Sequence, residues 1–179
     1  MRKIVVYSLL SLDGVAEAPE SFLTNWDDEA MDAHLAATIG TQDAVILGRR
    51  SYDEWVGFWP GSTIEPFAPF INSVPKFVVT STPLDREWTN TRVVRGDLID
   101  FVRELQDQPG ADIGVHASIS VARALLAEGV VDELRLAIVP AIAGTGRRLL
   151  EALPAQRLES MRSATAATGK LMVDYRVMR

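Results

Sequence analysis

The chain is 179 residues long, 47% hydrophobic and 23% charged, with a formal net charge of −6 at pH 7. This composition excludes an intrinsically disordered chain and is most simply explained by a single domain spanning residues 1–179. The acidic balance excludes a global basic field that would attract nucleic acid or anionic membranes, and the absence of cysteine excludes disulfides and thiolate metal sites. We therefore expect no nucleic-acid partner and no membrane partner.

The N-terminal stretch imitates a secretory signal, because Arg2-Lys3 precede an apolar run and Ala16-Glu17-Ala18 follow it. However, Tyr7 and Ser11 interrupt the run, and Asp13-Gly14 is a turn pair before the supposed cleavage site. A first strand explains these residues better, and no run reaches the length of a transmembrane helix. We expect a soluble, cytoplasmic protein.

Strands and helices are predicted to alternate along the chain. Short apolar segments bounded by turn residues predict strands at 3–9, 43–47, 76–80, 92–94, 112–115 and 133–139. Helical patterns lie at 27–39, after a cap at Asp97, and after a cap at Ser118 or Ser120, where Gly129 occupies the position of a left-handed C-terminal cap. This alternation is typical of a largely parallel sheet with helices on both faces.

The last third of the chain differs. Apolar residues recur every second position over 171–178, and Thr168-Gly169-Lys170 would join this strand to another at 157–165. The sequence therefore predicts a C-terminal antiparallel hairpin. Residues 57–74 are rich in proline and are expected to form an ordered loop over the sheet edge.

Candidate ligand-binding residues follow the predicted strands, because ligands of open α/β sheets gather at the carboxyl ends of strands. Five segments are expected to converge there: Asp13-Gly14, Gly48-Arg49-Arg50-Ser51, Thr80-Ser81-Thr82-Pro83, His116-Ala117-Ser118 and Gly144-Thr145-Gly146-Arg147-Arg148. Neither a GxGxxG fingerprint nor a Walker lysine loop is present. Any dinucleotide would therefore be held by small residues, hydroxyls and backbone amides.

The segment Gly48-Arg49-Arg50-Ser51 is the most informative of these. A buried strand ends at Gly48, and two guanidinium groups with a hydroxyl open the next helix, where free backbone N–H groups favour a phosphate. The simpler interpretation is an ordinary strand-to-helix turn with solvated arginines, and the segment by itself does not exclude it.

A cluster of carboxylates opens the first predicted helix, at Asp27, Asp28, Glu29 and Asp32. Most of them are expected to be solvated charges that complement the helix dipole, but one on the inner face can act as an acid or orient a substrate. Trp26, directly before them, can wall a planar ligand or simply pack.

The two histidines, His34 and His116, are far apart in sequence and lack a paired carboxylate at metal-ligand spacing, so no metal site is expected. His34 is predicted to lie on a helix surface and His116 to be a structural imidazole at a strand end.

Four segments carry a family resemblance: Ser11-Leu12-Asp13-Gly14, the run from Asp43 to Tyr52, Val131-Asp132-Glu133-Leu134, and Pro140-x-x-Ala143-Gly144-x-Gly146. In this order they resemble the dihydrofolate-reductase-like superfamily. The most similar group is the one that contains the C-terminal reductase domain of the bifunctional riboflavin-biosynthesis deaminase-reductase. The resemblance covers nearly the whole chain, although no single motif is specific.

The resemblance implies a dihydrofolate-reductase-like three-layer α/β fold that binds NADPH and transfers hydride to a small pterin-, pyrimidine- or carbonyl-type substrate. It assigns the cofactor to Gly48, Arg49, Arg50, Ser51, Thr80, Ser81, Ala117, Ser118, Gly144 and Gly146. It assigns substrate contacts to Asp13 and Trp26, and the catalytic role to Asp32, with Asp28 as the alternative acid. Asp32 lies sixteen residues before Gly48, as the substrate-binding acid of dihydrofolate reductases lies before its glycine.

This chain departs from that pattern at three positions. His116-Ala117 stand where the family places a glycine pair, Tyr7 stands where riboflavin reductases carry a lysine, and Ile39 falls near their arginine. The riboflavin precursor is therefore not the expected substrate. No zinc motif of a fused deaminase occurs either.

Two hypotheses follow for the function. The first is an NADPH-dependent reductase, with NADPH preferred over NADH because the arginine pair follows the second strand and no acid occurs between Gly48 and Tyr52. The alternative is a non-catalytic ligand-binding or regulatory homodimer that keeps the fold. In both cases the apolar residues of the C-terminal hairpin predict a homodimer.

Overall fold

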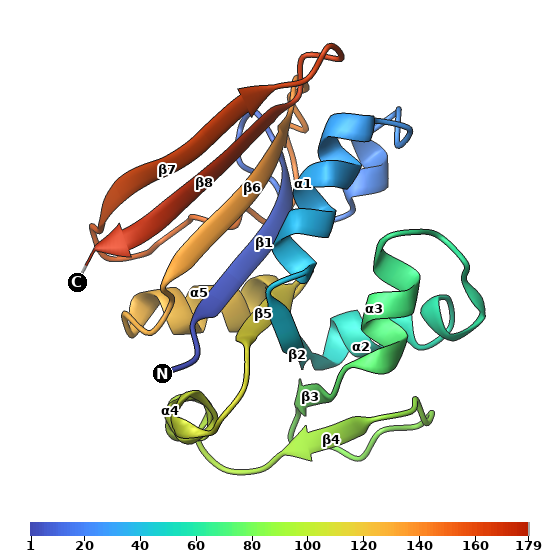
Figure 1. The fold of residues 1–179 in the computed structure, drawn as a ribbon, viewed down its shortest axis with the longest axis vertical. Helices are drawn as coiled ribbons and strands as arrows, with labels where there is room; N and C mark the ends of the chain where they lie inside the picture. Colours follow the sequence, from blue (N-terminus) through green and yellow to red (C-terminus); the bar gives the residue numbers. More distant parts are fainter. Residues whose placement is uncertain (179) are drawn as a thin grey trace.

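The computed structural model describes residues 1–178 as one eight-stranded sheet with helices on both faces (Figure 1). The strands are β1 (Ile4–Ser11), β2 (Gln42–Gly48), β3 (Lys76–Val79), β4 (Thr91–Val94), β5 (Asp112–His116), β6 (Glu133–Val139), β7 (Arg157–Thr165) and β8 (Leu171–Met178). The helices are α1 (Glu29–Ile39), α2 (Arg49–Trp55), α3 (Phe67–Ser73), α4 (Leu98–Asp107) and α5 (Ile119–Ala127). Short 3-10 turns lie at Pro19–Ser21 and Trp59–Gly61.

The strand order is β4-β3-β2-β5-β1-β6-β8-β7. Strands β1 to β6 pair in parallel, and β8 runs antiparallel to both β6 and β7. The predicted parallel sheet with a C-terminal antiparallel hairpin is therefore confirmed, and β7 and β4 form the two edges (Figure 1).

The surroundings of β2 explain why its sequence is apolar at successive positions rather than at every second one. Val45 and Leu47 pack into one hydrophobic cluster with residues of α3, whereas Ile46 packs into the cluster on the other face with residues of α4 and α5. All three side chains are fully buried. A strand covered by helices on both faces needs apolar residues at every position.

Two residues that were predicted to mark helix ends do so in the structure. Asp97 caps α4, because its carboxylate accepts from the backbone amides of Ile99 (2.8 Å) and Asp100 (3.1 Å). Gly129, after α5, has φ +65°, a left-handed conformation that favours glycine.

The prediction for residues 57–74 was wrong in part. Instead of a continuous loop, the segment contains α3, in which Phe67 and Ile71 are buried against β2 and β3. The prolines at 66 and 69 mask this helix in the sequence, but Pro66 is the N-cap and Pro69 falls in the first turn, where proline is tolerated.

None of the helices in residues 1–178 has the length and apolarity that crossing a membrane requires.

Candidate functional site

The carboxyl ends of β2 and β5 are joined by a chain of hydrogen bonds. The Gly48 backbone amide donates to Ser118 Oγ (2.9 Å), Ser118 Oγ donates to Ser51 Oγ (3.1 Å), and Ser51 Oγ donates to the Ala117 carbonyl (3.0 Å). We call these four residues the 48–118 junction. It brings together two segments that the sequence assigned to one site. Both hydroxyls are used inside the protein, so any ligand here would meet backbone amides rather than these side chains.

Two backbone features of the 48–118 junction affect what can approach it. A Cβ at Gly48 would lie 3.4 Å from Val121 Cγ2, so α5 packs closely against the end of β2. Ala117 has φ +50°, which is unfavourable for a residue with a side chain. Its methyl group stands at the turn into α5, where the resemblance to riboflavin reductases implies a glycine. A cavity of about 10 Å³ borders this turn, with room for about one water molecule.

Arg49 is bound within the protein rather than free. Its guanidinium donates to Asp53 (2.7 Å), Asp85 (2.6 Å), Thr82 Oγ1 (2.6 Å) and the Pro83 carbonyl (2.7 Å). Arg49 therefore holds the 80–85 loop against α2.

The other polar groups around the 80–85 loop are more open. The Thr80 hydroxyl accepts from the Thr82 backbone amide (3.1 Å), and Ser81 is exposed. Arg50 is two-thirds exposed and is paired with Glu17 (3.0 Å) at the surface. Arg50 is thus the more available cation of the pair.

The carboxylate of Asp13 is occupied by hydrogen bonds within the protein. Its carboxylate accepts from Ser11 Oγ (2.7 Å) and from the backbone amides of Ala143 (2.9 Å) and Gly144 (3.0 Å). These hydrogen bonds, that of Ser11 first, lower the pKa of Asp13 to about 2. Asp13 therefore fixes the 143–146 loop. Within that loop Gly146 has φ +116°, and a Cβ there would lie only 2.7 Å from Val15 Cγ1.

Arg147 lies in one of the five segments expected at the strand ends, but it was not among the residues assigned to the cofactor. Its guanidinium donates to Ser120 Oγ (2.7 Å) in the first turn of α5, and no carboxylate in residues 1–178 forms an ion pair with it. A cation beside the positive end of a helix is unfavourable by itself but suits a shared anion. The only signal in the sequence was its position directly after the Gly144–Gly146 turn.

Asp28 and Asp32 have different environments, although both open α1. One oxygen of Asp28 caps the helix by accepting from the amides of Ala30 and Met31 (3.1 Å each), and the other accepts from Thr168 Oγ1 and from Lys170 Nζ (3.0 Å). The Thr168 hydrogen bond and Lys170 outweigh burial and lower the pKa of Asp28 to about 2. All its acceptor positions face the protein, which favours a structural role over the catalytic one we predicted as the alternative.

Asp32 is half-buried, and its carboxylate forms no hydrogen bond or ion pair with residues 1–178. Burial, and then the charges of Asp27 and Asp28, raise its pKa. An unpartnered carboxylate of raised pKa can accept a substrate N–H or deliver a proton. Trp26, half exposed in the loop before α1, lies at the outer surface of this region.

The prediction for His34 was wrong. Instead of lying on the helix surface, His34 is 1% exposed, and its Nε2 lies 2.6 Å from Asp174 Oδ1 on β8. The sequence could not show this, because Asp174 is 140 residues away. His116 is buried at the end of β5, where it was predicted to be a structural imidazole, with Nε2 2.8 Å from Gln42 Oε1, but its Nδ1 has no hydrogen-bond partner in residues 1–178. Burial lowers its pKa to about 3. Within residues 1–178 no group of three metal-ligating side chains is arranged to hold a metal ion.

Comparisons with known proteins agree with this architecture. The family model of the RibD C-terminal domain matches residues 2–172. The uncharacterized protein YyaP of Bacillus subtilis is 24% identical over 97% of this chain and 94% of its own length. A putative riboflavin biosynthesis protein of Shewanella sp. PV-4 has the same fold, with a TM-score of 0.81 and 19% identity over 99% of both chains.

A more distant structural relative is the dihydrofolate reductase of Enterococcus faecalis, solved with NADP(H). It superposes with a TM-score of 0.69 and 12% identity, over 99% of this chain and 97% of the reductase. The fold is therefore dihydrofolate-reductase-like, as predicted, and is a reductase fold. Because the family model covers nearly the whole sequence, the chain belongs to the RibD C-terminal domain family.

Proposed function

We propose that the protein is an NADPH-dependent reductase of a small pterin-, pyrimidine- or carbonyl-type substrate. The observation that carries the proposal is the 48–118 junction, which gathers a close-packed glycine, the amides at the start of α5 and nearby arginines at the carboxyl ends of two adjacent parallel strands. Such an end of an open α/β sheet suits a phosphate-bearing cofactor.

The residues present fit a dinucleotide. The Gly48 amide is used by Ser118, so the amides of Ala117 and Ser118 would hold the pyrophosphate, and Arg147 would share that anion. Arg50, Thr80 and Ser81 would face the adenosine ribose. Gly144 and Gly146 would keep the neighbouring loop close to the cofactor. When bound, the reduced nicotinamide supplies the hydride.

Asp32 supplies the remaining chemistry in this proposal. Its carboxylate would orient the substrate by accepting an N–H or O–H, and in its protonated form it would deliver a proton to the reduced heteroatom. The raised pKa keeps a protonated fraction at higher pH than an ordinary aspartate has. Asp13, which we predicted as a substrate contact, would act indirectly through the 143–146 loop, whereas Trp26 would wall the substrate.

A cofactor titration tests this function. The purified chain is titrated with NADPH and NADH while nicotinamide fluorescence and melting temperature are followed, and NADPH oxidation is then assayed with a panel of pterins, pyrimidines and small aldehydes. Tight NADPH binding and turnover of one panel member support the proposal. Absence of a shift with either cofactor contradicts it.

Arg50→Ala is expected to weaken NADPH about tenfold or more and to leave NADH nearly unchanged. A charge-assisted contact to the 2′-phosphate contributes about 1.5–3 kcal/mol, and NADH lacks that group. Because Arg50 is mostly exposed, the melting temperature should stay within about 1 °C of the parent. Dissociation constants for both cofactors provide the measurement.

The matched variant is Arg49→Ala. It removes the three hydrogen bonds that hold the 80–85 loop and a fourth to Asp53 within α2, so it should lower stability as well as NADPH affinity. Equal losses of NADPH and NADH affinity in the Arg50 variant would show that this arginine does not read the phosphate.

Ala117→Gly is expected to raise NADPH affinity about threefold to tenfold without lowering the melting temperature. The substitution removes the methyl group at the pyrophosphate turn and relieves a left-handed conformation that costs about 1 kcal/mol with a side chain. Calorimetric titration and thermal unfolding measure the two effects. Weaker binding by the glycine variant would mean that the pyrophosphate lies elsewhere.

One observation favours a second candidate function, which is non-catalytic ligand binding or regulation. The methyl group of Ala117 and the water-sized cavity beside it restrict the space at the turn into α5. A non-catalytic ligand-binding or regulatory homodimer would keep the fold with such a narrowed pocket. In that case Ala117→Gly would gain NADPH binding that the parent lacks.

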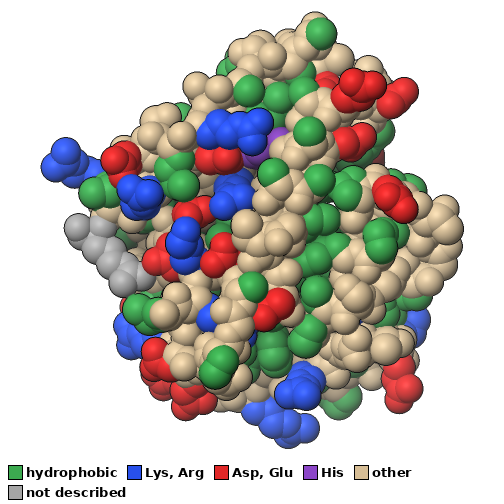
Figure 2. All heavy atoms as spheres, in the orientation of Figure 1, with side chains coloured by type: hydrophobic (Ala, Val, Ile, Leu, Met, Phe, Trp, Pro, Cys, Tyr) green, Lys and Arg blue, Asp and Glu red, His purple; other side chains and the backbone are tan. Residues whose placement is uncertain are grey.

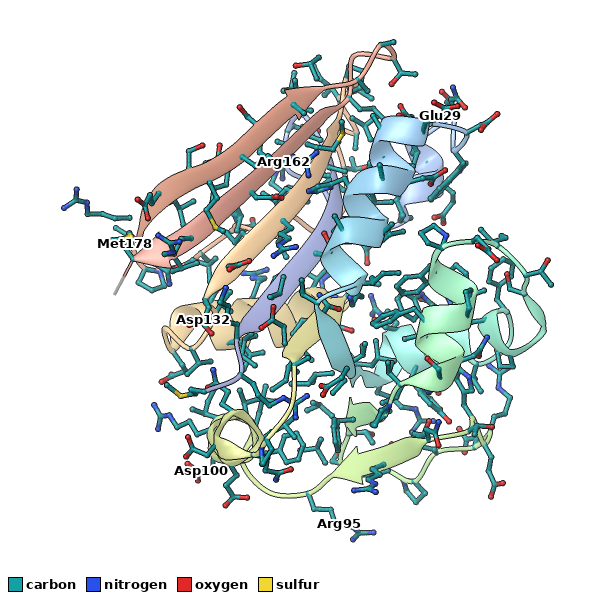
Figure 3. The ribbon with its side chains drawn as sticks, viewed as in Figure 1. Glu29, Arg95, Asp100, Asp132, Arg162 and Met178 are labelled. Atoms are coloured by element: carbon teal, nitrogen blue, oxygen red, sulfur yellow. The ribbon has the colours of Figure 1, made fainter. Side chains whose placement is uncertain are left out.

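We also propose a homodimer through the hairpin. Strand β7 is one edge of the sheet, and Leu158, Met161, Leu171 and Met178 are exposed on β7 and β8. Figure 3 labels Met178 at the end of β8. An edge strand with exposed apolar side chains invites a partner. We expect a dimer in sedimentation at micromolar concentration, and a monomer after Leu158→Glu with Met161→Glu. A monomeric parent would refute the dimer.

A further inference from the structure

A second cavity lies at the end of α5 that is farther from the proposed cofactor site. Helix α5 starts beside the 48–118 junction, and the residues at its other end border a space of about 360 Å³. Arg103, Gln106 and Asp107 of α4 and Glu128 after α5 line this space, which we call the α4–α5 cavity. Small-molecule sites occupy about 300–1,000 Å³, so the cavity has room for a ligand much larger than water.

Gln106 is a buried and fixed polar side chain in the wall of the α4–α5 cavity. It is 3% exposed, and its Nε2 donates to the Arg2 carbonyl (3.0 Å) and to Asp132 Oδ2 (3.4 Å). Because a carbonyl oxygen only accepts, the first contact fixes the orientation of the side-chain amide. Its Oε1 forms no hydrogen bond within residues 1–178 and is not among the enclosed unpartnered atoms there, so it is open to the cavity. An oxygen left unpaired on a buried side chain indicates a donor from a bound molecule.

Two carboxylates of the cavity stand at the C-terminal ends of helices. Asp107 is the last residue of α4, and Glu128 is the C-cap of α5. Neither helix has a basic residue in its last turn, and neither carboxylate forms an ion pair within residues 1–178. A helix C-terminus carries partial negative charge, so an acid there is unfavourable by itself. The two positions therefore favour a cation in the cavity.

Arg103 is a competing charge rather than a second ligand contact. It is exposed and lies four residues before Asp107, the spacing at which side chains on a helix meet. Asp100 and Glu104 are also exposed on α4, and acidic side chains gather where this helix lies, at the lower left of Figure 2. In so acidic a setting Arg103 would approach Asp107 when the cavity is empty and would be displaced by a cationic ligand.

The acceptors of the cavity favour an organic cation over a metal ion. No group of three metal-ligating side chains is arranged to hold a metal anywhere in residues 1–178. Two carboxylates and the Gln106 amide oxygen instead match the three N–H donors of a primary ammonium group. The volume of the cavity leaves space for an alkyl chain attached to that group.

We propose that the α4–α5 cavity is a binding site for a short aliphatic polyamine, whose terminal ammonium group donates to Asp107, Glu128 and Gln106 Oε1. The site shares no residue with the proposed reductase site, and the inference does not depend on that function.

Calorimetric titration of the full chain with spermidine tests the proposal, at about 0.15 M salt so that attraction to dispersed surface charge is screened. We expect one site per chain. Asp107→Asn and Glu128→Gln should each weaken spermidine about fivefold or more, through loss of a charge-assisted contact. Glu104→Gln is the matched control, because it makes the same change of charge on α4 outside the cavity lining, and it should change the affinity less than about twofold.

Two further measurements distinguish lost binding from lost folding. Asp107→Asn removes an acid from a helix C-terminus, so its melting temperature without ligand should be unchanged or higher. Spermidine should raise the melting temperature of the parent and raise that of Asp107→Asn less. Arg103→Met should tighten spermidine about threefold, because the variant lacks the cation that competes for Asp107.

Three outcomes would overturn the inference. The first is the absence of both binding heat and a melting shift with millimolar spermidine. The second is an equal loss of affinity in Glu104→Gln and Asp107→Asn, which would mean general attraction to an acidic surface. The third is weaker binding by Arg103→Met, which would mean that the guanidinium contacts the ligand and that the ligand is not a simple cation.

Discussion

Asp32→Asn is expected to lower turnover about 100- to 1000-fold while leaving the melting temperature unchanged or slightly higher. The carboxylate has no internal partner, and burial together with the like charges of Asp27 and Asp28 disfavours its ionised form. A neutral amide removes that repulsion but cannot deliver a proton. Turnover of the best substrate in the panel, with thermal unfolding in parallel, measures both effects.

The pH dependence provides a second measure for Asp32. If it delivers the proton, the parent rate is highest where Asp32 is protonated and falls as pH rises through its raised pKa. The Asp32→Asn rate should lack this decline. Asp27→Asn is the matched control, because Asp27 is exposed in the same acidic cluster and should keep nearly full turnover. Unchanged turnover in the Asp32 variant would refute its catalytic role.

Lys170→Met is expected to destabilise the fold by about 3–5 kcal/mol. Lys170 and Asp28 are both buried, and removing the ammonium leaves an uncompensated carboxylate at the start of α1. The same lysine donates to the Asn25 carbonyl (2.8 Å), so the hairpin turn also loses its contact with the loop before α1. Chemical denaturation measures the loss.

A double-mutant cycle separates the ion pair from its surroundings. Asp28→Asn keeps the cap on α1 but removes the charge, so Asp28→Asn with Lys170→Met should cost clearly less than the sum of the single changes. Additive losses would show that the two side chains do not interact. Arg176→Met, at an exposed pair with Glu159, is the control and should cost less than about 1 kcal/mol.

The Asp28 contacts also predict how stability depends on pH. The folded-state pKa of about 2 is below the ordinary value of 3.8. The stabilisation from Asp28 is therefore fully present above about pH 4 and is lost as pH falls from about 4 toward 2. Asp28→Asn should flatten this part of the stability curve relative to the parent. An unchanged acid dependence would assign it to other carboxylates.

The sequence predicted the secondary structure correctly where residues close together in the chain define the strand or the helix end. The apolar run of β2, the Asp97 cap of α4 and the left-handed Gly129 after α5 each depend on neighbouring residues, and all three are confirmed. The alternating pattern of β8 likewise predicted the hairpin, since an alternating strand must have one face covered. In residues 57–74 the three prolines led to the prediction of a loop, although apolar residues are spaced as in a helix over α3. That part of the prediction was wrong.

The sequence also predicted which segments meet at the candidate site, since the carboxyl ends of neighbouring parallel strands must lie at one edge of the sheet. Gly48, Ser51, Ala117 and Ser118 are joined as that rule requires. What each side chain does there was not predictable. Arg49 is held by Asp85, and Asp13 by the amides of a loop about 130 residues later.

Only the tertiary structure distinguished two aspartates that open the same helix. Asp28 and Asp32 are four residues apart and have the same chemistry. Lys170 and Thr168, on the hairpin turn, donate hydrogen bonds to Asp28 but not to Asp32. His34 was misplaced for the same reason, because its partner Asp174 lies on β8. Local propensities and periodicity are set by neighbours along the chain, and they fixed the fold. The ionisation and availability of a side chain depend on burial and on charges from distant segments, which the sequence order does not contain.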